Sequence, residues 1–394
     1  MTGSRRIVLL GAMAQMPFAG VAWQVLQYLE GLRRLGHRVT YVEDTGNWPY
    51  DPERDTVTDD AAAAVRRLKR VLERAGLVER WAYVNAARGG ETWGMEVTAL
   101  GRELSRADIL INLSGATVLS EAHLGVPVRI YLETDPVTPQ IEIANGRQFT
   151  IEFLAAHTHH FSFGERLGSP GCEVPVGRFS YRPTRQPVVL DWWSPPAGAE
   201  PRTRPLRFTT VANWEQSHKD IEWAGETYTW SKSAEFLKLL ELPRSLPEGL
   251  VLELALALDD EATIALLERH GWRVVAALPL SREPQAYRDY IQGSAGEFSV
   301  AKDQNVRLRS GWFSDRTATY LAAGRPAVVQ DTGFDAALPT GEGLFSFRTQ
   351  EDAAAGLQAV ASDYERHSRA ARELAEAHFR AEDVLGRLLD EAGA

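Results

Sequence analysis

The sequence predicts an α/β protein made of two units, each a parallel sheet covered by helices. Short apolar segments alternate with amphipathic helical segments along most of the 394 residues, and buried parallel strands have this nearly continuous apolar character. The alternation stops at "DWWSPPAGAEPRTRPLR" (191–207), which is rich in Pro, Gly and charge, and then resumes. A chain of this length also exceeds what one hydrophobic core usually serves.

Residues 1–190 form the first predicted unit. Helices are indicated by three-to-four apolar spacing, and strands by short apolar runs. The predicted strands are 5–12, 38–43, 108–115 and 128–135, and the predicted helices are 20–36 and 60–76.

The linker 191–207 leads to a second predicted unit, 208–375. Its helix 259–271 begins at the acidic pair Asp259-Asp260, and helical sequence fills most of 350–392. The predicted strands are 208–214, 249–258, 272–280, an apolar run after Gly324, and 344–349. We expect two Rossmann-like domains that face each other across a cleft, with residues 376–394 packing back on the first domain. A ligand is expected at the carboxyl ends of the strands.

Composition excludes several classes of protein. The net charge of −10 argues against a general nucleic-acid binder, and we expect no nucleic-acid partner. Cys172 is the only cysteine, which excludes CxxC metal motifs and fits a reducing cytoplasm. Arg5-Arg6 and the apolar run after them predict a first strand rather than a signal peptide. No stretch reaches the roughly 20 apolar residues of a membrane span.

The segment "LRSGWFSDRTATYLAAGRPAVVQDTGF" (308–334) contains a candidate phosphate-binding turn. Ser314 is a suitable N-cap, and Asp315, Arg316 and Thr317 form the first helical turn after it. Free backbone N–H groups and the helix dipole favour an anion at such a turn. The alternative is plain capping, in which Ser314 satisfies the N–H groups and Asp315 complements the dipole.

A second polar group follows the next strand. Asp331, Thr332 and Gly333 stand at its carboxyl end, close to the expected cleft. Small polar residues there can reach hydroxyl groups of a ligand, whereas the alternative is an ordinary Asp-Thr-Gly turn.

The run "SGWFS" (310–314) resembles the donor-binding region of GT-B glycosyltransferases. Gly311, Trp312 and Ser314 match the Cys-Gly-Trp-Asn-Ser run of the natural-product and plant sugar transferases. Arg309 stands where that family has a His, and Phe313 where it has an Asn. The retaining family of this fold has two Glu residues eight apart, and Gly311 and Thr319 occupy those positions here.

The segment "PFAGVAWQVLQYLEGLRRLGHRVTYVE" (17–43) is similar to the opening loop, first helix and second strand of the retaining family. Gly20 matches the second glycine of its loop, whose backbone faces the donor phosphates, while Ala19 replaces the first. Gly36, His37 and Val39 match its Gly-His-x-Val, in which the His is structural.

The resemblance implies transfer of a sugar from a nucleotide-diphosphate sugar to an acceptor hydroxyl, without a metal. The donor would be a UDP-, dTDP- or GDP-sugar, and no other cofactor is implied. Lys232 resembles a phosphate-binding Lys that follows the first strand of the second domain, a strand that ends near Asn213; a solvated helix residue is the alternative. The expected donor-binding residues are Gly20, Asn213, Lys232, Arg309, Ser314, Asp315, Arg316, Thr317, Asp331, Thr332 and Gly333.

The candidate catalytic base is Asp135, which ends a strand in the acceptor-side unit. A carboxylate there can take a proton from an acceptor hydroxyl, and a helix N-cap before Pro136 is the alternative. His157 and His159 would share one face if both lie on a strand, although a structural role is the default for that cluster.

Two other functions are compatible with the sequence. One is a sugar-nucleotide epimerase of the same fold, and the other is a non-catalytic two-lobed ligand-binding protein. A nicotinamide dehydrogenase is disfavoured, because "GAMAQMPFAG" after the first strand lacks the GxGxxG spacing.

Overall fold

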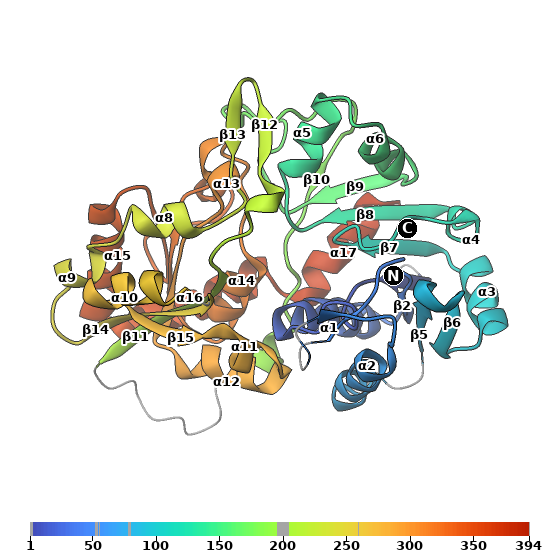
Figure 1. Cartoon of the computed structure of the whole chain (residues 1–394), viewed down its shortest axis with the longest axis horizontal. Coiled ribbons are helices and arrows are strands. Elements are labelled where there is room, and N and C mark those ends of the chain that lie inside the picture. The colour runs from blue at the N-terminus through green and yellow to red at the C-terminus, as the bar shows by residue number, and fades with distance from the viewer. Residues whose placement is uncertain are drawn as a thin grey trace.

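The computed structural model describes residues 3–51, 54, 56–77, 80–194, 205–258 and 260–393. Figure 1 shows two α/β units side by side, which confirms the predicted fold class. Each unit contains one large sheet. Within the described ranges, no helix is both long and apolar enough to cross a membrane.

The first sheet has eight strands in the order β10-β9-β8-β7-β1-β2-β5-β6. Neighbouring strands are parallel except for β5 and β6. The strands are β1 Arg6–Leu10, β2 Arg38–Glu43, β5 Trp81–Asn85, β6 Glu91–Gly94, β7 Ile109–Leu113, β8 Val128–Glu133, β9 His159–Ser162 and β10 Arg182–Pro183. Its helices are α1 Ala19–Arg34, α2 Ala62–Arg74, α3 Val97–Ser105, α4 Glu121–Leu124, α5 Thr138–Ala144 and α6 Gln148–Ala155, with the 3₁₀ turn η1 Ala86–Arg88. A two-stranded ribbon, β3 Tyr50–Asp51 and β4 Thr56–Val57, lies between β2 and α2 in the chain.

The second sheet has six parallel strands in the order β15-β14-β11-β16-β17-β18. They are β11 Leu206–Asn213, β14 Leu250–Ala257, β15 Arg273–Ala276, β16 Gly296–Ser299, β17 Ala327–Gln330 and β18 Leu344–Phe347. Its helices are α8 Ser233–Leu237, α9 Leu242–Ser245, α10 Glu261–Arg269, α11 Ala277–Ser281, α12 Pro284–Gly293, α13 Asp303–Arg307, α14 Asp315–Ala322, α15 Gln350–Ser362 and α16 Tyr364–His378. The short elements η2 Ser217–Lys219, η3 Phe334–Ala336 and the ribbon β12 Ile221–Trp223 with β13 Glu226–Tyr228 complete the unit.

Most predicted elements appear within a few residues of their expected bounds, because burial and periodicity are local properties of the sequence. The strand expected at 272–280 is wrong in its second half. β15 ends at Ala276, and Ala277–Ser281 form helix α11. Asp260 caps α10, since its carboxylate accepts hydrogen bonds from the N–H groups of Ala262 and Thr263; Asp259 lies outside the described residues.

The segment 191–207 does not begin as an open linker. Helix α7 (Leu190–Trp193) buries Trp193 completely, and the indole Nε1 donates to Gln27 Oε1 at 3.0 Å. Residues 195–204 lie outside the described part of the chain. The terminal helix α17 (Ala381–Glu391) packs on α1, where Leu385 and Ala381 fill the space beside Gly31.

Candidate functional site

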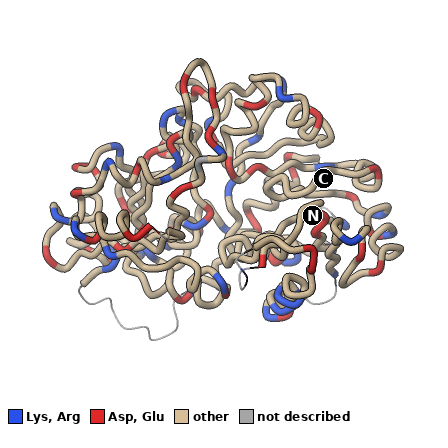
Figure 2. Tube along the Cα trace, viewed as in Figure 1, with Lys and Arg blue, Asp and Glu red and all other residues tan. Residues whose placement is uncertain are grey.

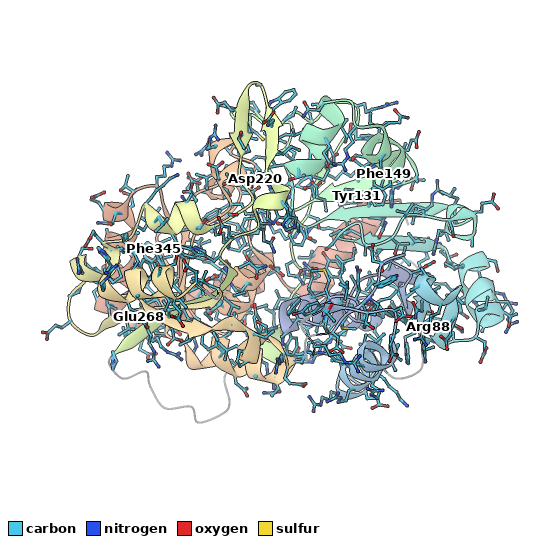
Figure 3. All side chains as sticks on the ribbon, in the orientation of Figure 1. Arg88, Tyr131, Phe149, Asp220, Glu268 and Phe345 are labelled. Atoms are coloured by element: carbon cyan, nitrogen blue, oxygen red, sulfur yellow. The ribbon has the colours of Figure 1, made fainter. Side chains whose placement is uncertain are left out.

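A cavity of about 840 Å³ lies between the two units, at the carboxyl end of the first sheet. Tyr131 and Asp220, labelled in Figure 3, belong to its walls and come from different units. The first unit contributes Gly11, Ala12, Met16, Val21, Gln24, Val25, Leu113, Ser114, Tyr131, Glu133, Thr134, Asp135, Thr138, Pro139, Glu142, Asn145 and Arg147. The second contributes His218, Lys219, Asp220, Ile221, Trp230, Trp312 and Asp315.

Asp135 lines this cavity and pairs with a cation of the other unit. Its Oδ1 lies 2.5 Å from Nζ of Lys302, the N-cap residue of α13. The Asp135 side chain remains 43% exposed, whereas that of Lys302 is only 12% exposed. The predicted base therefore stands at the site, already paired with a buried ammonium group.

A second carboxylate, Glu133, lines the cavity and was not found from the sequence. It ends β8 and is buried. Its carboxylate accepts hydrogen bonds from Gln140 Nε2 at 2.9 and 3.0 Å, and one from Ser162 Oγ at 2.6 Å. Burial raises the pKa of Glu133 to about 7 despite these donors. The sequence signal that could have identified Glu133 is an acidic residue at the end of an apolar strand.

On the opposite side, the second unit lines the cavity with Lys219, Asp220, Trp230 and Asp315, and Lys302 lies behind Trp230. The Nζ of Lys302 lies 3.4 Å from the centre of the Trp230 ring, and the Nζ of Lys219 lies 4.9 Å from the same centre. Such short contacts with an aromatic face stabilise an ammonium group. These two lysines are the groups on this side that would attract an anionic ligand, next to the carboxylates Asp220 and Asp315.

Lys232 is buried next to these cations. Its Nζ lies 6.0 Å from the centre of the Trp312 ring. Burial, together with the positive charges of Arg316 and Lys302, lowers the pKa of Lys232 to about 7. A diphosphate placed here would reverse that effect by supplying negative charge.

The first turn of α14 reaches the cavity only in part. Trp312 and Asp315 line the wall, and burial raises the pKa of Asp315. Ser314 caps the helix, accepting from the Arg316 N–H at 3.2 Å, as the plain-capping alternative predicts. Ser314 and Thr317 are buried and line a separate small hollow.

The guanidinium of Arg316 points into the second unit rather than into the cavity. Its Nε pairs with Glu297 Oε1 at 2.6 Å, and its other nitrogens donate to Val211 O and Ser299 Oγ. The Arg316 side chain is thus bonded to protein groups, and its direct contact with a phosphate stays a prediction. Arg316 acts on the site at a distance, as one of the charges that lower the pKa of Lys232.

Asp331 is a structural residue in this fold. Its buried carboxylate pairs with Arg309 at 3.1 Å and Arg348 at 2.6 Å, and accepts from the Gly333 N–H. Thr332 Oγ1 donates to Trp312 O at 2.6 Å. The expected ligand contacts Arg309, Asp331, Thr332 and Gly333 do not line the larger cavity. Thr332 lines the small hollow that also includes Ser314 and Thr317.

The two histidines do not share a strand face. β9 begins at His159, so His157 precedes it. His157 is buried and makes ring contacts to Asn112 Nδ2 at 3.1 Å and Phe153 O at 3.0 Å. The His159 ring contacts Thr158 Oγ1. Neither residue is among those that line the cavity, so their candidate catalytic role stays a prediction without support from this geometry.

Gly20 and Asn213 are at the edges of the site. Gly20 lies in the first turn of α1, where an added Cβ would be 3.9 Å from the Tyr287 hydroxyl. The cavity wall includes Val21 instead. Asn213 is the last residue of β11 and is exposed.

Glu43 anchors the loop between β1 and α1. The carboxylate accepts from the N–H groups of Ala14 at 2.6 Å and Gln15 at 3.1 Å, and from the Tyr41 hydroxyl at 2.6 Å. Burial raises the pKa of Glu43 to about 7. The loop that Glu43 anchors contributes Ala12 and Met16 to the cavity.

The described part of the chain holds no group of three or more His, Cys, Asp and Glu side chains placed to bind a metal ion. No family model and no curated protein matches the sequence.

Solved structures do match over the whole chain. An alpha-glucosyltransferase in complex with UDP and a 13-mer DNA containing an HMU base has a TM-score of 0.59 at 11% identity, covering 100% of both chains. Anabaena Alr3699/HepE in complex with UDP-glucose has a TM-score of 0.57 at 11% identity, covering 99% of both chains. The chain has the GT-B fold. A glycosyltransferase from Rickettsia africae is also similar, with a TM-score of 0.53 at 8% identity, covering 99% of this chain and 98% of the other.

These GT-B neighbours correct one expectation. The absence of a nucleic-acid partner was inferred from the net charge of −10, but alpha-glucosyltransferases of this fold were solved in complex with DNA. An acidic total charge therefore does not exclude nucleic acid for a GT-B chain, because binding depends on local patches of charge.

Proposed function

We propose that this protein is a glycosyltransferase that moves a sugar from a nucleotide-diphosphate sugar to a hydroxyl group of an acceptor. The observation that carries the proposal is the arrangement of charge across the cavity. Lys219, Lys302 and the buried Lys232 stand on the second unit, and the carboxylates Glu133 and Asp135 stand on the first.

The lysines are suited to the leaving group. As the bond between the anomeric carbon and the diphosphate oxygen breaks, negative charge develops on the diphosphate. Preorganised cations in a partly buried site stabilise that charge. UDP is the proposed nucleotide, because the neighbours of this fold include complexes with UDP and UDP-glucose.

Asp135 is the proposed base. The acceptor oxygen bonds to the anomeric carbon while its proton passes to the Asp135 carboxylate. Lys302 pairs with Asp135 and contacts the Trp230 ring on the second unit. We therefore propose that it lies next to both the base and the leaving diphosphate.

A panel of UDP-, dTDP- and GDP-sugars tests the proposal. Thermal shift measures binding, and released nucleoside diphosphate measures transfer or hydrolysis. An interconverted sugar would instead indicate an epimerase, and binding without turnover would indicate a two-lobed binding protein. We expect UDP to stabilise the wild type and Lys69→Met, whose lysine is exposed on α2, but to stabilise Lys232→Met much less.

DNA is a second candidate acceptor. Helix α2 carries the exposed cations Arg66, Lys69, Arg70 and Arg74, and Figure 2 shows their cluster of positive charge. The DNA-bound neighbours favour this candidate. Glucose transfer from UDP-glucose to duplex DNA with an HMU base would support it, provided that Arg66→Glu with Arg70→Glu weakens DNA binding and leaves UDP binding unchanged. Binding without salt dependence would contradict it.

A further inference from the structure

The ribbon formed by β3 and β4 is bonded to the loop that contributes Met16 to the cavity. Both units contribute charged side chains to the cavity, but the first unit also contributes an apolar wall made of Met16, Val21, Val25 and Leu113. The proposed function puts the nucleotide diphosphate beside the lysines of the second unit. The apolar wall is therefore left for the acceptor.

This wall extends outward through Met16, which is 46% exposed. The residue before it is tied to the ribbon, because the Tyr50 N–H donates to Gln15 O at 3.0 Å. The rings of Phe18 and Tyr50 also stack with their centres 5.7 Å apart. These contacts place the ribbon beside the loop that contributes Met16 to the cavity.

The ribbon presents two further apolar side chains to solvent. Val57 is the cross-strand partner of Tyr50 and is 58% exposed. Trp48 is 52% exposed and precedes Pro49, whose carbonyl accepts from the Thr58 N–H at 3.0 Å. Single exposed apolar residues are ordinary on a protein surface. Here Met16 lines the cavity, and Trp48 and Val57 belong to the segments paired beside it; we name these three the apolar rim.

We infer that the acceptor is amphipathic, with a hydroxyl-bearing end that enters the cavity near Asp135 and an apolar body that lies on the apolar rim. The inference rests on the proposed function and adds the chemical class of the acceptor. The indole of Trp48 offers a flat apolar face to such a body, and burying it there removes apolar surface of both partners from water.

Calorimetric titration with methyl β-D-glucoside and octyl β-D-glucoside tests the inference. Both probes are titrated into the UDP-bound protein, below the micelle concentration of the octyl compound. We expect the octyl probe to bind at least about tenfold more tightly, because several of its methylene groups become buried. Trp48→Ala and Val57→Ser should each reduce that preference to roughly threefold or less.

Val97→Ala is the matched control, because Val97 is 60% exposed at the start of α3 and is not part of the apolar rim. Equal affinity for the two probes, no binding of the octyl probe, or a preference that survives both rim variants would overturn the inference. UDP binding is measured separately on the same samples. A wild-type protein that does not bind UDP would count against the proposed function. UDP binding without a preference for the octyl probe would count against the amphipathic acceptor alone.

Discussion

Asp135 and Lys302 form an ion pair of 2.5 Å that joins the two units at the wall of the cavity, although 167 residues separate them in the chain. Trp312 makes a second link nearby. Its indole Nε1 donates to Thr134 O at 2.9 Å, and its backbone forms a bridge with Gly164. The proposed base and the proposed leaving-group cation are thus held in one polar network that spans both units.

Asp135→Asn should reduce the rate of sugar transfer by a factor of about 10² to 10⁴, the usual contribution of a general base. The amide retains the shape of the side chain but cannot accept the proton at neutral pH. Initial rates of UDP release in the presence of acceptor measure the effect, with UDP-induced thermal shift as the test of folding and donor binding. Full activity of this variant would move the base elsewhere, and Glu133→Gln would then be the next variant to assay.

Lys232 should make donor binding depend on pH. Because the pKa of Lys232 in the free protein is lowered to about 7, the amine loses its proton as the pH rises through this value. UDP affinity should therefore fall between about pH 6 and 8, by up to tenfold if one charge-assisted contact is lost. Lys232→Arg should bind UDP with a flatter pH profile, because a guanidinium stays charged. A wild-type profile identical to that of Lys232→Met would contradict a role for this ammonium group.

Glu43 and Glu133 should make the folded state less stable as the pH rises. The pKa of each is raised from 4.5 to about 7 by burial, so the folded state holds protons that the unfolded chain has released. The free energy of unfolding should fall between about pH 4.5 and 7 and then level off. The expected decrease is about 3 kcal/mol for each group. Glu133→Gln should make this decline shallower in urea unfolding followed across that range. A decline as steep as that of the wild type would show that Glu133 is ionised even at the acid end.

Trp193→Ala should destabilise the protein by about 3–5 kcal/mol, because this side chain is completely buried. Trp193 packs against Trp23 with ring centres 4.9 Å apart, and its Nε1 donates to Gln27. Trp48→Ala is the control and should change the free energy of unfolding by less than about 0.5 kcal/mol. Urea unfolding of both variants measures the difference. Similar stability of the two would contradict a stabilising role for the buried Trp193 of α7.

The sequence predicted part of the candidate site. Asp135 lines the cavity and Lys232 lies close to it, as their positions after strands suggested. Glu133 was missed because it is buried at the end of an apolar strand, and a buried carboxylate is rare. Arg316, Asp331 and Thr332 were also expected at the ligand, and their side chains contact protein groups in this structure, which the sequence did not indicate.

What the sequence by itself determined is the series of helices and strands and their grouping into two units, because spacing and burial of apolar residues are local signals. Only the tertiary structure decided which charged groups face the cavity. Arg316 turns inward because Glu297 on β16 lies 2.6 Å away, whereas Asp135 meets Lys302 at the cavity wall. The partner of a charged side chain is whichever opposite charge folding brings within a few ångströms, and a local pattern carries no record of residues far along the chain.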